Sequence, residues 1–254
     1  MLRTQGVGKA FGGLRAVHQV TIEVPVGSIT AVIGPNGAGK STLMNLISGF
    51  IAPDIGAITV GEDGIAGLRP HQICRKGIAR TFQNLQMFQD MSAKEVVITG
   101  RQLHRSAPLL SELLMLPAAR RVERAAAQEA EELLTKLEVP AGFWERRAGD
   151  LPYGLQRRVE IARALATQPR YLLLDEPAAG LNDEETAALG RTLRELAATG
   201  RGIALIEHDI ELVMSVSDHV FVMDAGTVIA GGTPAAVRKD PKVIRAYLGD
   251  SVDG

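Results

Sequence analysis

Hydrophobic and polar residues alternate along residues 17–24, which predicts a half-exposed β-strand ended by Pro25 and Gly27. Residues 28–33 are mostly apolar and predict a strand buried on both faces. Other strand patterns lie at residues 57–60, 171–175, 203–207 and 219–223, and helical patterns at 41–48 and 184–199. Strands that alternate with helices favour a largely parallel, doubly wound sheet, which binds ligands at the carboxyl ends of its strands.

Strand patterns fade between residues 83 and 150, where helical patterns take over. Residues 119–138 place apolar side chains along one helical stripe, formed by Val122, Ala126, Leu133, Leu134 and Leu137. The apolar run at residues 109–116, closed by Pro117, is shorter than the roughly 20 residues that a membrane-spanning helix needs, so it predicts a short packed helix. We therefore expect a mainly helical insert in an α/β fold.

A glycine-rich loop follows the buried strand at residues 28–33. It fits the pattern GxxxxGK[ST] and consists of Gly34, Pro35, Asn36, Gly37, Ala38, Gly39, Lys40, Ser41 and Thr42. Glycines let backbone N–H groups point inward, and the helix that opens near Lys40 adds the positive end of its dipole. Lys40 would then reach the β- and γ-phosphates of a nucleotide, Ser41 would coordinate Mg²⁺, and Thr42 would support the phosphates. The alternative, a glycine turn that caps an ordinary helix, is disfavoured by the preceding strand.

Two more predicted strands end in side chains that suit phosphate chemistry. The apolar strand at residues 171–174 leads into Asp175 and Glu176, which a parallel sheet would present beside the glycine-rich loop. Asp175 can hold Mg²⁺, and Glu176 can act as general base on the water that attacks the γ-phosphate. The strand at residues 203–207 delivers His208 to the same edge, where its imidazole could donate to the γ-phosphate. A solvated carboxylate pair and a structural histidine are the alternatives.

Composition narrows the possible settings. The formal net charge of −1 over 254 residues gives no global attraction to nucleic acid, so direct nucleic-acid binding is not expected. A single cysteine, Cys74, excludes an internal disulfide and agrees with a reducing compartment, where it would be a small buried hydrophobe. The amino terminus lacks the apolar run of a signal peptide, so we expect any membrane role to depend on a partner.

A further motif, at residues 151–165, lies between the helical insert and the strand that ends in Asp175. With this segment in place, essentially the whole chain resembles the ATP-binding subunits of ABC transporters. The resemblance implies a P-loop NTPase (RecA-like) core with a mainly parallel sheet, an N-terminal antiparallel β portion and a helical subdomain. It implies one domain over residues 1–254, with the core and β portion at 1–83 and 157–254 and the helical subdomain at 84–156.

The resemblance also implies roles for single residues. The glycine-rich loop corresponds to the Walker A loop that binds ATP, and Asp175 and Glu176 correspond to the Walker B pair. His208 corresponds to the switch histidine. Gln83 corresponds to the Q-loop glutamine, which joins Ser41 and Asp175 at Mg²⁺ and Glu176 and His208 in catalysis. Phe11 falls where the family usually places an aromatic ring against adenine, with a packed core ring as its alternative.

The family's signature motif is usually LSGGQ, and here the aligned residues are Leu151, Pro152, Tyr153, Gly154 and Leu155. Pro152 has neither a hydroxyl nor an N–H group, so the phosphate contact would fall to backbone groups near Gly154, at the start of a helix. In this family that helix faces the ATP of a second subunit. Leu151, Tyr153 and Gly154 would therefore bind ATP in trans, in a head-to-tail dimer of identical or related chains. Asn182 replaces the usual aspartate of the D-loop.

Several motifs look most like the branched-chain amino-acid importer subunits: Tyr153-Gly154 and residues 77–84, 175–182, 206–209 and 246–249. This likeness implies two transmembrane permease subunits, an indirect substrate-binding protein, and a cytoplasmic position on the inner face of the cell membrane. Met87, Phe88 and Met91 would contact a permease helix, unless they are core residues. Import of urea, amides or aromatic acids, lipid export, a soluble ABC regulator acting on nucleic acid or ribosomes, and a P-loop kinase are the alternatives.

Overall fold

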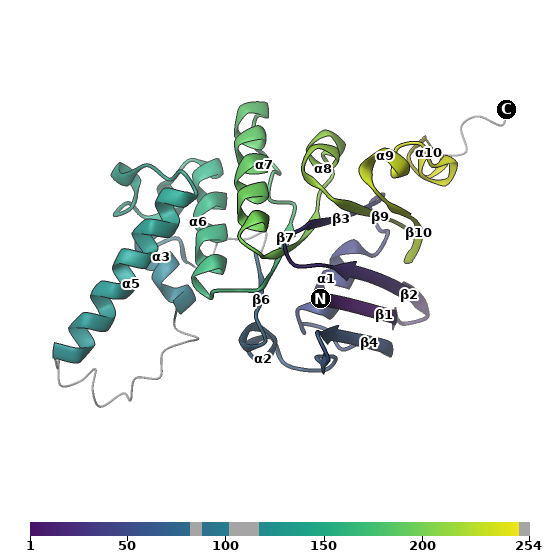
Figure 1. Cartoon of the computed structure of the whole chain (residues 1–254), viewed down its shortest axis with the longest axis horizontal. Helices are drawn as coiled ribbons and strands as arrows, with labels where there is room; N and C mark the ends of the chain where they lie inside the picture. The colour runs from purple at the N-terminus through teal and green to yellow at the C-terminus, as the bar shows by residue number, and fades with distance from the viewer. Residues whose placement is uncertain (82–87, 102–116, 249–254) are drawn as a thin grey trace. The chain divides into compact units, whose positions relative to one another are not determined.

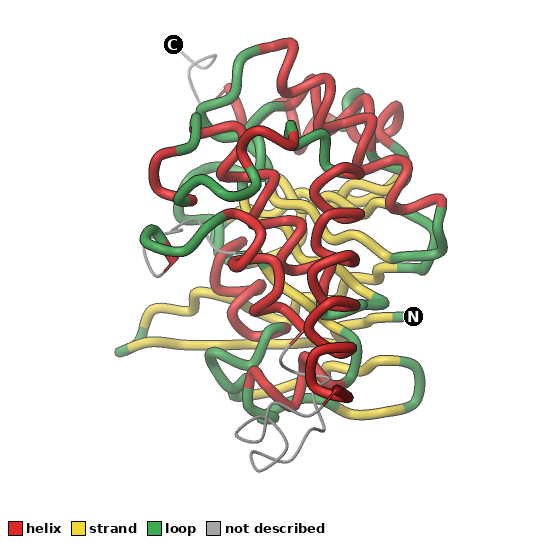
Figure 2. The backbone as a smooth tube through the Cα atoms, turned by 90° about the vertical axis from the view of Figure 1, so that its left-hand side faces the viewer, coloured by secondary structure: helices red, strands yellow, loops and turns green. Residues whose placement is uncertain are grey.

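A computed structural model describes residues 1–81, 88–101 and 117–248, and Figure 1 shows its helices and strands. The chain divides into two compact units. The first unit comprises Met1–Arg80 and Arg170–Gly254, and the second comprises Thr81–Pro169. All named strands of the described residues belong to the first unit, and they are the yellow segments of Figure 2.

The first unit contains a six-stranded sheet with the order β10-β9-β3-β8-β7-β6. These strands are β3 (Ile29–Ile33), β6 (Ile78–Arg80), β7 (Tyr171–Asp175), β8 (Gly202–Ile206), β9 (His219–Asp224) and β10 (Thr227–Gly232). The pairs from β6 to β9 are parallel, and β10 is antiparallel to β9. Every residue of β3, β7 and β8 is buried, as expected for parallel strands covered on both faces. The predicted parallel sheet is confirmed.

A second sheet in this unit is antiparallel, with the order β2-β1-β4-β5. Its strands are β1 (Leu2–Phe11), β2 (Leu14–Val24), β4 (Ile55–Val60) and β5 (Asp63–Gly64). The sequence pattern predicted parts of β2 and β4 but missed β1. Two glycines at residues 6 and 8 and several register shifts interrupt the alternation of β1.

Helix α1 (Lys40–Ile47) shares one hydrophobic core with both sheets of the first unit. Leu43, Leu46 and Ile47 pack in this core with residues of β1 and β2 and with alternate residues of the parallel strands. Because side chains alternate across a sheet, the remaining strand residues face the opposite side, where α7 (Asp183–Ala198) contacts β3 and β8. Gly49, at φ 75°, ends α1 in the left-handed conformation that the sequence suggested.

Other helices of the first unit are α2 (Pro70–Arg75), α8 (Ile210–Val216), α9 (Pro234–Val237) and α10 (Pro241–Leu248). Cys74 lies on α2 and is half-buried rather than buried. Asp209 precedes α8 as its N-cap, and its Oδ1 accepts the Leu212 N–H at 2.9 Å, so a side-chain cap fixes the start of this helix.

Helices α3 (Ala93–Gly100), α5 (Pro117–Lys136) and α6 (Tyr153–Ala166) form the second unit with the short 3₁₀ segments η3 (Ala141–Phe143) and η4 (Ala148–Asp150). Gly100 lets α3 approach α6 closely, since a Cβ there would lie 2.2 Å from the Arg163 carbonyl oxygen. Helix α6 packs on α3 and α5, so the whole of α6 belongs to this unit. The second unit spans Thr81–Pro169, and the helical subdomain was expected at residues 84–156.

The predicted helix at residues 119–138 corresponds to α5. Ala126, Leu134 and Leu137 are buried as the stripe predicts, and Leu133 is half-buried. Val122 lies on the same stripe but is exposed. Residues 121–125 are all exposed, which indicates that the described contacts of α5 begin near Ala126. The expected helix at residues 109–116 lies outside the described residues.

Candidate functional site

The glycine-rich loop joins β3 to α1 and is fixed by contacts within the first unit. Gly39, at φ 97°, is the residue before α1, and a Cβ there would lie 2.2 Å from the Ala16 carbonyl oxygen. A Cβ at Gly34 would lie 2.0 Å from the Met223 carbonyl oxygen. The Gly226 N–H also donates to the Ala38 carbonyl at 3.1 Å. The loop is thus wedged between β2 and the turn that joins β9 to β10, where a side chain at either glycine would clash.

Lys40 is buried at the start of α1, and its Nζ donates to the carbonyl oxygens of Gly34 at 2.7 Å and Pro35 at 2.9 Å. Burial lowers the pKa of Lys40 from its ordinary value, and the nearby carboxylates of Glu176 and Asp175 oppose this shift. The ammonium group is therefore poorly solvated and would gain a strong interaction from an anion placed over the loop.

Arg80 and Asp175 form a buried ion pair beside α1. Arg80 Nη2 donates to Asp175 Oδ2 at 2.9 Å, and the two side chains are only 9% and 8% exposed. Arg80 Nη1 also donates to Asn45 Oδ1 at 2.6 Å and Ser48 Oγ at 3.0 Å, so it links the end of β7 to α1. Asp175 Oδ1 is buried and has no hydrogen-bond partner among the described residues.

This donor set fits a Mg²⁺ ion. Hard cations prefer carboxylate, hydroxyl and phosphate oxygens, which the unpartnered Asp175 Oδ1, the Ser41 hydroxyl and a nucleotide would supply. The described part of the chain holds no cluster of three or more histidine, cysteine or acidic side chains suited to a metal. A metal at this edge would therefore depend on the phosphates as well as on the protein. Gln83, the third expected ligand, lies outside the described residues.

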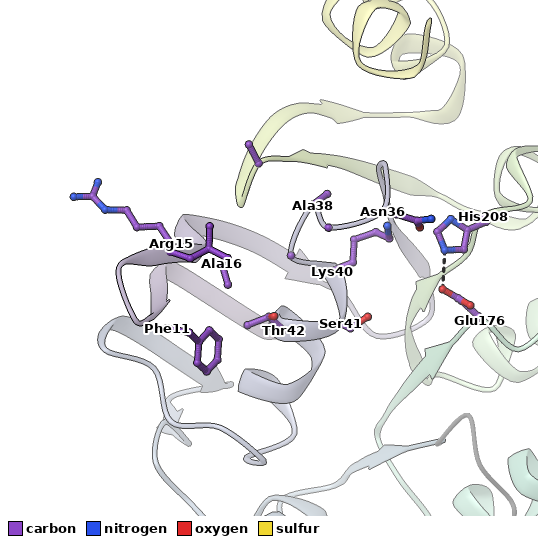
Figure 3. Close-up of a pocket in the computed structure, with 14 residues that line it drawn as sticks. Phe11, Arg15, Ala16, Asn36, Ala38, Lys40, Ser41, Thr42, Glu176 and His208 are labelled. Carbon is purple, nitrogen blue, oxygen red and sulfur yellow. Dashed lines mark hydrogen bonds and ion pairs between the residues drawn. The ribbon is translucent and has the colours of Figure 1, made fainter. Parts of the chain in front are cut away.

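Glu176 and His208 face each other at the carboxyl ends of β7 and β8. His208 Nε2 and Glu176 Oε1 lie 2.7 Å apart, and Figure 3 shows this contact beside Asn36 and Lys40. Glu176 has φ 50°, a left-handed backbone conformation that is uncommon for a residue with a side chain. Its N–H donates to the Ile206 carbonyl at 2.9 Å. The two predicted polar residues are thus brought together in one place.

A pocket of about 490 Å³ is lined by residues 36–42 of the glycine-rich loop and by Glu176 and His208. Phe11 lines it and is 46% exposed, so the alternative that Phe11 is a packed core ring was wrong. The sequence reasoning missed other lining residues, which are Leu14, Arg15, Ala16 and Ala225. The glycine pair at residues 12 and 13 between β1 and β2 and the Ala225-Gly226 turn between β9 and β10 were the signals for two hairpins that could have located them.

The signature residues belong to the second unit, at the start of α6. Leu151 is buried, Gly154 is buried in the first turn of α6, and Tyr153 is exposed. Arg157 lies over the Tyr153 ring, 4.8 Å from its centroid, and donates to the Tyr153 hydroxyl. Pro152 precedes the helix and provides no side-chain cap, which leaves the first N–H groups of α6 to other acceptors.

Four other residues were singled out in the sequence: Asn182, Met87, Phe88 and Met91. Asn182 caps α7, because its Oδ1 accepts the Glu185 N–H at 2.9 Å. Phe88 is half-buried beneath the Arg163 guanidinium, whose Cζ lies 5.1 Å from the ring centroid, and Met91 is also half-buried. Met87 lies outside the described residues.

Comparisons with known proteins match nearly the whole chain to ATP-binding proteins of ABC transporters. A family model described as "ABC transporter" matches residues 17–179, and one described as "Branched-chain amino acid ATP-binding cassette transporter" matches residues 227–253. The high-affinity branched-chain amino acid transport ATP-binding protein BraF of Pseudomonas aeruginosa is 44% identical over 252 residues, covering 99% of this chain and 98% of that protein. LivG of Escherichia coli K12, with the same description, is 42% identical over 255 residues, with the same coverage.

Solved structures agree as well. A nucleotide-free ATP-binding cassette from an ABC transporter has a TM-score of 0.86 and 34% identity, covering 98% of this chain and 99% of that chain. The ADP conformation of an ATP-binding cassette of an ABC transporter has a TM-score of 0.84 and 33% identity, with the same coverage. These likenesses confirm the predicted P-loop NTPase fold. Within the described residues, no helix is both long and apolar enough to span a bilayer.

Proposed function

Because this chain belongs to the ATP-binding subunits of ABC transporters, and among them to the branched-chain amino acid transport ATP-binding proteins, we propose that it hydrolyses ATP to power import of branched-chain or other hydrophobic amino acids. The main support for this proposal is the nearly full-length similarity to BraF and LivG. A separate family match at residues 227–253 points to the same kind of transporter. The chain then acts as one ABC ATPase domain, with ATP as its substrate.

ATP binding is assigned to the loop from Gly34 to Thr42. Its wedged backbone and buried Lys40 supply inward donors for the β- and γ-phosphates, and the exposed ring of Phe11 supplies a face for adenine. Ser41, Asp175 and Gln83 would hold Mg²⁺, which when bound balances the charge on the phosphates. The unpartnered Asp175 Oδ1 supports this part of the assignment.

Hydrolysis is assigned to Glu176, and the likeness to the family assigns supporting catalytic roles to His208 and Gln83. The Glu176 carboxylate accepts a proton from the water that attacks the γ-phosphorus, and the attack breaks the bond to the β–γ bridging oxygen. The His208 imidazole holds Glu176 Oε1 at 2.7 Å and lines the same pocket, so it can donate to the γ-phosphate when ATP is bound. This pairing keeps the base oriented before substrate arrives.

The site requires a second subunit to be complete. Tyr153 and Gly154 at the start of α6, together with Leu151, present backbone donors to the ATP of an identical or related chain in a head-to-tail dimer. ATP then bridges two subunits, and its hydrolysis removes the contacts that hold them closed. The resulting motion passes to two transmembrane permease subunits, which this chain contacts at the inner face of the membrane. A substrate-binding protein delivers the amino acid to these permease subunits.

Transport assays test this function. The chain is co-expressed with a permease pair and a substrate-binding protein from the same organism, and the purified complex is placed in vesicles with internal ATP. We expect uptake of labelled leucine, isoleucine and valine by the wild type, none with Glu176→Gln, and normal uptake with Glu195→Gln, an exposed site on α7. Uptake of urea or an aromatic acid instead of these amino acids contradicts the proposed substrate, and failure to co-purify with a permease contradicts the proposed partner.

A further inference from the structure

Glu207 is a buried carboxylate beside the hydrolytic pair. It follows β8 directly and is only 3% exposed, whereas its neighbour His208 lines the ATP pocket. These two neighbouring residues therefore have very different surroundings. None of the atoms that line the described pocket belongs to Glu207.

The Glu207 carboxylate is bound by backbone N–H groups. Oε1 accepts the Ala178 N–H at 2.6 Å, and Oε2 accepts the His208 N–H at 3.2 Å. Burial raises the pKa of Glu207, while hydrogen bonds from Ala178, His208 and Asp209 oppose the rise. Within the described ranges, no lysine, arginine or histidine forms an ion pair with Glu207. Burying a carboxylate without a cationic partner costs free energy, and hydrogen bonds must offset that cost. We therefore ask which segment these hydrogen bonds hold in place.

The held segment is the turn that follows β7. Asp175 pairs with Ile206 in the sheet, and the next residue, Glu176, adopts φ 50°. This conformation costs on the order of 1 kcal/mol or more, and a following proline adds a further restriction. Pro177 has no N–H group, so the next donor along the chain is the N–H of Ala178. The strained residue therefore lies between two anchors, the Ile206 carbonyl and the Glu207 carboxylate.

We propose that Glu207 is a positioning residue for ATP hydrolysis, whose carboxylate anchors the Ala178 N–H and thereby keeps Glu176 in its left-handed conformation against His208. The inference rests on the proposed function, in which Glu176 is the general base. Glu207 and His208 then act as a pair from the end of β8, one holding the backbone after the base and the other its side chain.

An amide cannot replace this carboxylate. Glu207 accepts at both oxygens, whereas glutamine would turn an NH₂ group toward one of the N–H donors and leave both groups unsatisfied. We expect Glu207→Gln to loosen the turn at residues 176–178. Misplacing a catalytic group by about 1 Å costs up to about 100-fold in rate, so we expect hydrolysis to slow by about 10- to 100-fold. Affinity for ATP should change by less than about threefold, because Glu207 does not line the pocket.

The experiment uses the full chain and three readouts: equilibrium binding of Mg²⁺ and ATP, single-turnover hydrolysis, and hydrogen exchange of the Ala178 amide. Glu207→Gln should show faster exchange at Ala178, slow hydrolysis and near-normal binding. Glu207→Asp, which keeps a carboxylate but shortens it, should be intermediate in exchange and rate, and it also decides the question if Glu207→Gln does not fold. Glu195→Gln and Val213→Ala are controls for the charge change and for a general loss of stability in α8.

Unchanged exchange at Ala178 overturns the proposal, as does hydrolysis at the wild-type rate in folded Glu207→Gln. An equal loss of rate in Val213→Ala also overturns it, because the effect would then reflect stability alone. Failure of the proposed function looks different. A wild-type chain that never hydrolyses ATP contradicts that function, while hydrogen exchange still decides whether Glu207 holds the turn.

Discussion

The geometry of the buried ion pair of Arg80 and Asp175 predicts how much stability is lost when Arg80 is replaced. Arg80→Met removes the guanidinium and keeps an apolar stem of similar length, so it leaves the Asp175 carboxylate buried without its partner at 2.9 Å. Breaking a buried pair by removing one member costs about 3–5 kcal/mol. Arg80 also gives up its hydrogen bonds to Asn45 and Ser48, which places the expected loss toward the upper end of that range.

Arg194 offers a matched control. It pairs with Asp218 at 2.8 Å, but the two side chains are 49% and 42% exposed. An exposed pair of this kind contributes about 0–1 kcal/mol, so Arg194→Met should lose several-fold less stability than Arg80→Met. The two pairs differ in burial and in the additional hydrogen bonds of Arg80 to Asn45 and Ser48, so the comparison measures these two effects together.

Urea unfolding, followed by intrinsic fluorescence and circular dichroism, measures both variants with and without Mg²⁺ and ATP. We expect the Arg80→Met loss to shrink when both ligands are present, because a bound cation would again balance the Asp175 carboxylate. ATP with a chelator should not restore the stability. Equal losses in Arg80→Met and Arg194→Met would falsify the reasoning from burial, and a loss that Mg²⁺ and ATP leave unchanged counts against Asp175 as a metal ligand.

Further predictions concern the ATP pocket. Phe11→Ala should weaken ATP binding by about 10-fold and leave tripolyphosphate binding unchanged in calorimetry, since stacking on a base contributes about 1–3 kcal/mol; equal losses for both ligands would contradict a contact with adenine. The pKa of Lys40 lies below 10.5, so Lys40 loses its proton as pH rises from neutrality toward that value. The affinity for ATP should therefore fall over this range. The Lys40→Met variant, which binds ATP weakly at every pH, should show no such fall. Gly39→Ala should abolish ATP binding through its clash with the Ala16 carbonyl, while Gly200→Ala, also at positive φ but in open space, should cost about 1 kcal/mol of stability and leave binding intact.

Local sequence patterns were sufficient for the elements that carry the expected chemistry. The strand that ends at Asp175 was predicted with its observed bounds, because an unbroken run of four apolar residues before the carboxylate is typical of a parallel strand buried on both faces. The parallel order then placed Glu176 and His208 at one edge of the sheet, where they are 2.7 Å apart. The glycine-rich loop was also predictable, because all the residues of its pattern are contiguous in the sequence.

Features that depend on distant pairing were not predictable in this way. Arg80 meets Asp175 across 95 positions of sequence, and no local pattern marks an arginine as the partner of that carboxylate. Leu14 and Ala225 reach the pocket because two hairpin turns bring them there. Val122 satisfied the helical stripe but is exposed, since periodicity alone does not say how far along a helix its neighbours extend. Gln83 stays a prediction.

Single-turnover hydrolysis of γ-labelled ATP by Glu176→Gln tests the central claim most directly. We expect the variant to bind Mg²⁺ and ATP with near-normal affinity and to release phosphate at least about 100-fold more slowly than the wild type, because the attacking water loses its base. Glu195→Gln should hydrolyse ATP normally. Phosphate release by Glu176→Gln at the wild-type rate would contradict the assignment of Glu176, and with it the account of how this pocket hydrolyses ATP.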